Sequence, residues 1–420
     1  MVDVAAIHAV SEQLEVQRKA VGSPYSPRPE AHPERRSRHH LLISVDDHLV
    51  EPPDLFEGRL PKKFADREPR VIETTEGNQA WLLDGLLLPE IAINAVAGRP
   101  VEEQFIEPLR YDLVRRGTWD IKERIADMDV DGVYASLNFP SALGFGGVRL
   151  TMLDDPDFVL ALVRAYNDWQ MDEWAGYRPD RIIPCQIAYL LNAKIAADEV
   201  RANAARGYHT VTFPDLTHLV GLPSLFSDYW DPFFAACEET ETVLSVHACS
   251  GGVANKIDPA APLNAVAPFF GVAQAIHPAI EWIYAGIPSR FPELRICLSE
   301  GGIGWVIGLL DRLNHEYARN IPGRWVDGAP SELLLRKFVF CMLDDPTTMR
   351  QVRHVIGIDR LLLEVDYPHA DSSWPNSQEK WRRQFEGIPE EEVRRMAWKN
   401  ASELFKHPVP ASVQADPDSF

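Results

Sequence analysis

The sequence predicts a closed (β/α)8 barrel, the TIM barrel, on two observations. Eight short apolar runs of strand length recur along the 420 residues, at 41–46, 132–139, 181–189, 208–213, 242–247, 294–299, 337–342 and 360–366. Between them, apolar residues follow helical spacing at 119–128, 158–177, 193–205, 230–239, 302–317 and 347–356. Eight strand-plus-helix units in one chain are typical of this barrel. A doubly wound open sheet is the alternative, but no GxGxxG turn follows the first strand.

Length, composition and charge limit the classes of function. Apolar residues make up 45% and charged residues 25% of the chain, which is close to the average of folded soluble proteins. The formal net charge of -20 repels polyanions, so we expect a small-molecule substrate and neither nucleic acid nor an anionic membrane as a partner. No run approaches the roughly 20 apolar residues of a membrane span, and we expect a cytoplasmic protein.

Three extensions accompany the predicted barrel, which occupies residues 41–406. Residues 1–40 form an N-terminal arm that either packs on a neighbouring subunit or extends into solvent. Residues 52–117 separate the first strand from its helix, and loops this long are uncommon unless they are functional. Because they follow a barrel strand, we expect a lid-like insertion over the catalytic face. Residues 407–420 are rich in Pro, Ser and Asp, and they predict a frayed C-terminal tail.

The residues that carry chemistry lie where the predicted strands end. Asp46 and His48 are two positions apart at the end of the first strand, so their side chains leave the same face while Asp47 points elsewhere. Further candidates end the fifth, sixth and eighth strands, namely His247, Glu300 and Asp366. In such barrels the carboxyl ends of the strands meet at the catalytic face, so we expect these side chains to converge.

Two imidazoles and two carboxylates suit a divalent ion such as zinc or manganese, with one coordination position left for water or substrate. We expect Glu300 to act as a general base, because a carboxylate beside a metal-bound water can take its proton. The alternatives are that Glu300 is a further metal ligand or a hydrogen-bonded support of the ligands. Asp366 is assigned both as a ligand and as a catalytic residue, since a charge buried at a strand end needs a partner.

Four further side chains are candidates for contacting a substrate. His218 follows the fourth strand, His369 lies three residues beyond Asp366, and Trp305 and Trp374 flank the motifs of the sixth and eighth strands. The alternative for His369 is a supporting role behind the ligands, and for the two tryptophans it is ordinary core packing. In the insertion, three arginines are available to bind an acid: Arg59, Arg110 and Arg115.

Four motifs in order along the chain resemble the amidohydrolase superfamily: DxH at 46–48, SVHA at 245–248, SEGG followed by GW at 299–305, and EVDYPHADSSWPNS at 364–377. More closely, they are similar to the aminocarboxymuconate-semialdehyde decarboxylase-related branch, amidohydrolase family 2, over residues 41–405. The resemblance implies a metal-dependent barrel that decarboxylates, hydrates or hydrolyses small, often aromatic or unsaturated acids. It places one divalent ion on Asp46, His48, His247 and Asp366, and it suggests a homodimer. We expect this ion to be zinc, with manganese as the second choice.

The chain departs from many relatives at two positions. The first motif in many of them is HxH, whereas this chain has Asp46 in the first position, which makes manganese more credible. The sixth-strand motif in many relatives is SHGG with a catalytic His, whereas here Glu300 occupies that position. We therefore expect a metal-dependent carbon-carbon lyase (decarboxylase) or hydrolase, the latter acting on an amide or lactone. A non-catalytic barrel that binds a small ligand is the weaker alternative, because it predicts missing ligands and the set is complete.

Overall fold

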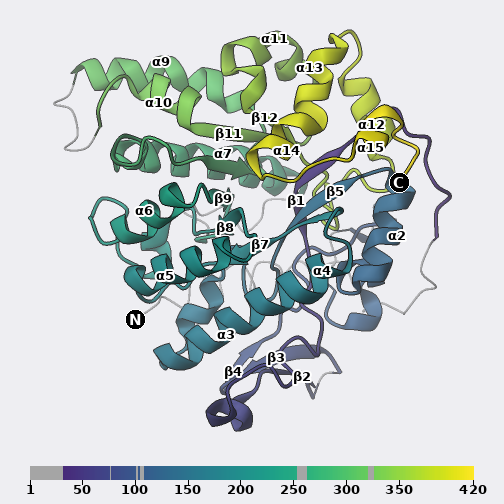
Figure 1. Cartoon of the computed structure of the whole chain (residues 1–420), viewed down its shortest axis with the longest axis vertical. Coiled ribbons are helices and arrows are strands. Elements are labelled where there is room, and N and C mark those ends of the chain that lie inside the picture. Colours follow the sequence, from purple (N-terminus) through teal and green to yellow (C-terminus); the bar gives the residue numbers. More distant parts are fainter. Residues whose placement is uncertain (1–31, 76, 101–102, 105–107, 253–262, 320–325) are drawn as a thin grey trace.

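A nine-stranded parallel sheet forms the centre of the computed structural model, which describes residues 32–75, 77–100, 103–104, 108–252, 263–319 and 326–420 (Figure 1). The strands are β1 (Ile43–His48), β5 (Ala135–Phe139), β6 (Ile182–Ile183), β7 (Cys185–Ile187), β8 (Thr210–Thr212), β9 (Val243–His247), β10 (Ile296–Ser299), β11 (Phe338–Met342) and β12 (Leu361–Leu363). Each of the eight predicted strand regions overlaps one of them, β1 extending two residues beyond its region, and the third contains two, β6 and β7.

The sheet closes on itself through the segment 182–187. The strand order is β6-β5-β1-β12-β11-β10-β9-β8-β7, so β6 and β7 stand at its opposite ends. In the chain, however, they are separated only by Pro184, which has no backbone N–H to donate to a neighbouring strand. The first half of the segment pairs with β5 and the second half with β8. Pairing therefore continues around the full circle, and the predicted barrel is confirmed.

The strands are buried on both faces, as expected for parallel strands covered by helices. In β12 and β11 every residue is buried, and their Leu, Phe, Val, Cys and Met side chains join one apolar core. β1 carries two buried carboxylates, Asp46 and Asp47, besides the buried Ser44 and His48. Buried polar side chains at the end of an otherwise apolar strand mark the place where the core meets a functional site.

Helices surround the ring of strands (Figure 1). The predicted helices correspond to α2 (Ile121–Asp131), α3 (Pro156–Trp169) with a π-helical continuation at Gln170–Trp174 and α4 (Ala175–Tyr177), α5 (Ala193–Ala204), α6 (Asp231–Glu239), α9 (Gly304–Arg319) and α11 (Pro346–Ile356). Side-chain caps fix three starts: Asp120, Asp155 and Asn192 accept backbone N–H groups at the first turns of α2, α3 and α5.

Several helices were not predicted, and they include α7 (Leu263–Tyr284), α8 (Ile287–Arg290), α10 (Pro330–Lys337), α12 (Ser377–Gln384), α13 (Glu390–Arg394) and α14 (Asn400–Leu404). The longest of them, α7, connects the fifth and sixth barrel strands. Its sequence is apolar over most of its length, so it lacks the alternation of polar and apolar faces by which an amphipathic helix is recognised.

The insertion after β1 carries a small sheet of its own. Strands β2 (Arg70–Glu73), β3 (Gln79–Leu83) and β4 (Leu86–Leu88) pair antiparallel and lie outside the barrel, at the bottom of Figure 1. Farther along the insertion, the backbone N–H groups of Val96 and Ala97 donate to the carbonyl of Pro368 at 2.9 and 2.8 Å. This part of the insertion therefore contacts the loop that follows β12.

The two ends of the described chain meet on the barrel. Of the N-terminal arm, residues 1–31 lie outside the described residues. The guanidinium of Arg38 lies 3.6 Å from the ring centroid of Phe420, which also packs edge-on against Tyr134 at 5.0 Å. The predicted fraying of residues 407–420 is thus wrong, because Phe420 finds aromatic and cationic partners on the barrel and α15 (Ala411–Ala415) precedes it.

In the described part of the chain, no helix has the length and apolarity needed to cross a membrane.

Candidate metal centre

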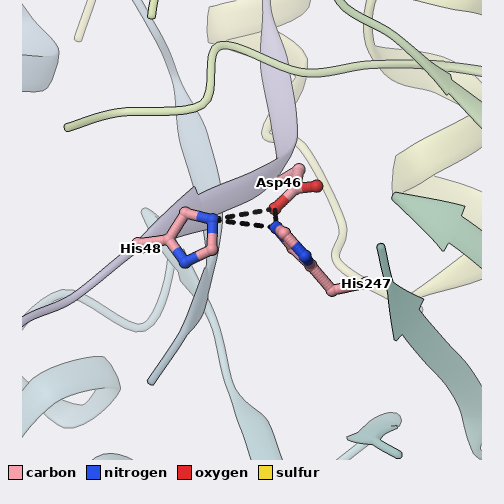
Figure 2. Close-up of side chains that lie close together, drawn as sticks. All are labelled: Asp46, His48 and His247. Carbon is pink, nitrogen blue, oxygen red and sulfur yellow. Dashed lines mark hydrogen bonds and ion pairs between the residues drawn. The ribbon is translucent and has the colours of Figure 1, made fainter. Parts of the chain in front are cut away.

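Asp46, His48 and His247 meet at the carboxyl ends of β1 and β9 (Figure 2). Oδ1 of Asp46 lies 3.5 Å from Nε2 of His48 and 3.6 Å from Nε2 of His247, and the two Nε2 atoms are 3.1 Å apart. All three side chains are fully buried. The convergence of Asp46 and His48 follows from their spacing, since residues two apart on a strand share a face.

Asp366 reaches the same point from the end of β12. Its Oδ1 lies 3.3 Å from Nε2 of His48, and its backbone N–H donates to the carbonyl of Asp46 at 2.9 Å. Asp366 has a left-handed backbone conformation with φ 58°, which is rare for a residue with a side chain and is retained mainly where the surroundings enforce it. The four predicted ligands thus form one cluster.

The carboxylates of this cluster have the properties of cation ligands. Both oxygens of Asp46 and both of Asp366 are buried and, among the described residues, have no hydrogen-bond partner. Burial, and next the nearby carboxylates, raise the pKa of Asp46 and of Asp366 well above the usual value. Unpartnered buried carboxylates that repel one another are costly unless a positive ion compensates them. The four side chains therefore fit a divalent cation.

The imidazoles are in the form that binds metals. Nδ1 of His247 lies 2.6 Å from the carbonyl oxygen of Ala248, and since a carbonyl only accepts, Nδ1 is the donor and Nε2 presents its lone pair to the cluster. Burial lowers the pKa of His247 to about 3 and that of His48 well below its usual value. Both rings are neutral at physiological pH, as coordination requires.

Glu300 lies at the edge of the cluster. Its Oε2 is 3.4 Å from Nε2 of His247, and 22% of its side chain is exposed, whereas the side chain of His247 is fully buried. Burial, followed by repulsion from Asp371 and Glu364, raises its pKa well above the usual value. The backbone N–H of Glu300 donates to Oε2 of Glu364 at 3.1 Å. Glu300 can therefore contact both the cluster and a molecule that enters from solvent.

The two glycines after Glu300 are required by its surroundings. A Cβ atom on Gly301 would lie 2.5 Å from the Cβ of Ala275 in α7, which is closer than such atoms approach. Gly302 has φ +58°, a conformation that glycine adopts without strain. The SEGG motif thus lets the chain turn directly over α7 and leaves Glu300 facing the cluster.

Asp47 binds the end of β1 to neighbouring parts of the barrel. As predicted, it points away from the cluster: its carboxylate accepts from Ser44 Oγ at 2.9 Å, from Ser136 Oγ at 2.5 Å and from the backbone N–H of Tyr367 at 3.1 Å. An Arg124 guanidinium nitrogen lies 3.9 Å away. These contacts join the end of β1 to β5 and to the segment that follows β12, at residues adjacent in sequence to Asp46 and Asp366.

A family model described as amidohydrolase matches residues 45–406 of the chain. The chain belongs to amidohydrolase family 2. The match covers most of the barrel and includes every predicted ligand and the whole of the motif around Asp366. The resemblance noted from the four sequence motifs is therefore confirmed.

Solved structures of similar fold include family members with assigned activities. An amidohydrolase from Mycobacterium avium subsp. paratuberculosis has 22% identity and a TM-score of 0.68, with 88% of this chain and 100% of that chain covered. A 5-carboxyvanillate decarboxylase from Sphingomonas paucimobilis has 20% identity and a TM-score of 0.61, with 87% and 99% covered. A dihydroxybenzoic acid decarboxylase from Polaromonas sp. JS666, with bound manganese, has 16% identity and a TM-score of 0.59, with 90% and 99% covered. These likenesses concern the fold.

His369 is the predicted substrate contact that the structure places in this amidohydrolase's cluster. Its Nδ1 lies 2.9 Å from Oδ1 of Asp366, and its ring stacks on that of His48 with the centroids 3.8 Å apart. Burial lowers its pKa to about 4, so the ring is neutral. His48, Asp366 and His369 together form a second set of three potential ligands that shares two members with the first cluster.

The other three predicted substrate contacts have different surroundings. Trp305 is buried against Phe340 and donates its indole N–H to the carbonyl of Gly302. Trp374 stacks under the guanidinium of Arg115 and donates to the carbonyl of Asp127. These contacts agree with the core-packing alternative. His218 lies on the surface beside Glu281 of α7, 3.5 Å away.

The three candidate arginines of the insertion contact carboxylates elsewhere. Arg115 pairs with Asp127, and both are nearly buried. Arg59 pairs with Glu173, and Arg110 with Asp112. Their guanidinium groups therefore have acidic partners of their own, and the expectation that one of them binds an acidic substrate gains no support from these contacts.

Several residues of the site escaped sequence analysis. Phe145, in the loop after β5, lies over the imidazoles, with ring centroids 4.5 Å from His48 and 4.3 Å from His247. Its loop is held by the buried carboxylate of Glu51, which accepts the backbone N–H groups of Ala142 and Leu143.

Asp371, which was also missed, forms a further acidic group with Glu300 and Asp366. Asp371 and Glu364 belong to the same EVDYPHAD motif as Asp366, and that acidic motif is the signal that could have found them.

Proposed function

We propose that the protein is a metal-dependent decarboxylase of a small aromatic or unsaturated carboxylic acid, with manganese or zinc as its ion. The observation that carries the proposal is the cluster of two neutral imidazoles and two buried carboxylates whose oxygens have no hydrogen-bond partner among the described residues. Manganese is favoured by the acid in the first motif position and by the manganese bound in the similar dihydroxybenzoic acid decarboxylase. When bound, the ion would hold the substrate carboxylate and an adjacent oxygen by Lewis-acid attraction.

Glu300 is proposed to hold the proton that the reaction needs. Loss of carbon dioxide leaves an electron pair on carbon, and an acid within reach must protonate that carbon. The pKa of Glu300 is raised by burial and by Asp371 and Glu364, so Oε2 retains a proton at a higher pH than an exposed glutamate does. Its partial exposure lets it reach a substrate, which the fully buried Asp46 cannot do.

Asp366 is proposed as both a ligand and a proton-handling group. Its Oδ1 lies between Nε2 of His48 at 3.3 Å and Nδ1 of His369 at 2.9 Å. The two neutral rings flank the carboxylate at the cluster. Its pKa is also raised by burial and by Asp371, which suits a carboxyl group that gives or takes a proton during turnover.

Phe145 supports an aromatic or conjugated substrate. Its ring covers the imidazoles of His48 and His247 and is only partly buried, so it offers an apolar surface next to the cluster. A planar acid bound at the cluster would stack against this ring, and stacking of that kind contributes about 0.5–1.5 kcal/mol beyond the burial of apolar area.

Hydrolysis of an amide or lactone is the second candidate. The partial exposure of Glu300 favours it, because a carboxylate at the edge of the cluster can also accept a proton from water. The two candidates differ in the state of Glu300: protonated for decarboxylation, ionised for hydrolysis. A barrel that only binds a ligand is weaker, since it gives no reason for two carboxyl groups of raised pKa to lie together.

The test is elemental analysis of the purified protein, without an affinity histidine tag, beside an Asp366→Ala variant. We expect near-stoichiometric manganese or zinc in the parent and loss of the ion in the variant. The loaded protein is then assayed with aromatic acids for carbon dioxide release and with amides and lactones for hydrolysis. A parent protein that takes up neither ion after incubation would contradict the proposal. Turnover of amides or lactones alone would select the second candidate.

We further propose that the protein is a cytoplasmic homodimer. Support for the dimer comes from the resemblance and from the N-terminal arm, whose first 31 residues lie outside the described part of the structure. Light scattering of the purified chain tests this, and a monomer at micromolar concentration would contradict it.

A further inference from the structure

His218, which the metal cluster does not use, belongs to a second group of metal-type side chains. Nδ1 of His218 lies 3.5 Å from Oε2 of Glu281, and Nε2 of His277 lies 2.9 Å from Oε1 of the same carboxylate. His277 and Glu281 are four residues apart on α7, so they occupy the same side of that helix. His218 comes from the 3-10 turn Thr217–Val220, which follows β8. Two imidazoles thus face the two oxygens of one carboxylate.

We propose that His218, His277 and Glu281 bind a transition-metal ion such as Zn²⁺, at a site separate from the cluster around Asp46. Two histidines and one glutamate are a donor set that zinc accepts, with the fourth position left to water. A helical pair four residues apart is a recurring way to present two ligands to one ion. Glu281 supplies the negative charge, and among the described residues its ion pairs are with these two imidazoles.

Binding of one ion would require the two imidazoles to move toward each other, because each now faces a different oxygen of Glu281 and their ligand atoms are more widely spaced than those of the cluster around Asp46. Ligand atoms around one tetrahedral zinc lie roughly 3.3 Å apart, and the two observed nitrogen-to-oxygen distances are 3.5 and 2.9 Å. The imidazole centroids are 6.5 Å apart, whereas two rings on one zinc have centroids about 5 Å apart. The side chains of His218 and His277 are 45% and 37% exposed, so both rings have room to turn toward a shared ion.

The backbone that carries the three ligands is already held together. Trp282, next to Glu281, donates its indole N–H at 2.8 Å to the carbonyl of Asp215, three residues before His218. Asp215 is buried, and its carboxylate accepts the backbone N–H of Cys249, two residues after His247. A site whose ligands stand on elements in fixed contact loses little conformational freedom when the ion binds. An ion here would strengthen the link between α7 and the loop that follows β8.

The proposal is tested by counting bound zinc after equilibrium dialysis of the full chain and its variants. We expect about two equivalents in the parent and about one in His277→Ala, which removes one ligand of three. His315→Ala is the matched control, because it deletes an exposed histidine of α9 and should keep both equivalents. Equal zinc content of His277→Ala and the parent would overturn the proposal.

Two further measurements keep the result interpretable. Asp366→Ala should lose the other equivalent, so one ion in the parent that is lost in Asp366→Ala but kept in His277→Ala refutes the surface site and leaves the proposed function intact. Glu281→Gln keeps the size of the side chain and should lose the same equivalent as His277→Ala. Melting temperatures without zinc check that both variants fold, and zinc should raise the melting temperature of the parent more than that of either variant.

Discussion

Nε2 of His247 lies 3.1 Å from Nε2 of His48, although the two residues are 199 positions apart in the chain. Because Nδ1 of His247 donates to the carbonyl of Ala248, its Nε2 offers a lone pair, and burial keeps both rings neutral. Asp46 and Asp366 add negative charge within 3.6 Å of these nitrogens. The cluster thus brings together four electron-donating side chains, and none of the four carries a positive charge.

Removal of divalent ions should lower the stability of the protein. Chelation leaves the buried carboxylates of Asp46 and Asp366 to repel each other, whereas an ion present at about 100 times its Kd stabilises by about 3 kcal/mol. Asp366→Asn removes one of these charges and keeps the shape. The chelated variant should therefore melt at a higher temperature than the chelated parent and gain less from added manganese or zinc. Thermal melting with and without ion measures both effects, and an equal gain in the two proteins would contradict the assignment of Asp366 as a ligand.

Glu300→Gln should lower kcat by about 10²–10⁴-fold while the ion content stays unchanged, as expected for loss of a group that transfers a proton. The measurement is turnover together with elemental analysis of the same sample. Glu293→Gln, at an exposed glutamate that precedes β10, is the control and should change neither quantity. Loss of the ion in Glu300→Gln would instead assign Glu300 as a ligand.

Phe145→Ala should raise the KM for an aromatic acid by about tenfold and change kcat less, because the ring contributes stacking and not proton transfer. Phe145→Leu keeps apolar area without the aromatic face and should fall between the parent and Phe145→Ala. Phe226→Ala removes a phenylalanine that is 50% exposed and serves as the control. Steady-state kinetics with the substrate found in the screen provide the values. An unchanged KM in Phe145→Ala would exclude stacking on this ring.

Asp131 should make the stability of the protein depend on pH. This carboxyl is buried beside Ser377, and burial raises its pKa from 3.8 to about 7. The folded protein therefore keeps this proton up to about pH 7, whereas the unfolded chain loses it near pH 4. The contribution of Asp131 to the free energy of unfolding is fully present below pH 4 and is lost as the pH rises through 7.

Asp131→Asn should flatten that dependence, because the amide stays neutral and can still accept the backbone N–H of Ser377. The effect amounts to a few kcal/mol at most, since each pKa unit corresponds to about 1.4 kcal/mol. Urea unfolding at pH 5 and pH 8 measures it, with the exposed Asp154→Asn as the control. The same loss of stability between the two pH values in Asp131→Asn and the parent would rule Asp131 out as its source.

Sequence patterns predicted the barrel and the meeting of the four clustered side chains, because both depend on short-range rules. Alternation along a strand put Asp46 and His48 on one face, and the strand ends placed His247 and Asp366 at the same edge. α7 was missed because it is apolar on most sides, and the small sheet of β2, β3 and β4 because it lies within a segment read as a loop.

Side chains on loops were harder to place than side chains on strands. Phe145 reaches the histidines because Glu51, nearly a hundred residues earlier, binds the backbone of its loop. Trp305 and Trp374 follow their strands closely in sequence, but each turns its indole N–H to a carbonyl away from the cluster. No periodicity records the direction in which a loop folds back, so these positions follow from tertiary contacts alone.

The ring of strands has a consequence for the order of events in folding. Asp46 and His48 come from the first strand of the ring and Asp366 from the last, and these strands become neighbours only when Ser44 pairs with Leu363. A chain that has built seven of its eight strands still lacks the fourth donor, Asp366, whose side chain approaches His48. Tight retention of an ion should thus begin with the final closure step, and ion uptake during refolding would report completion of the barrel and not its beginning.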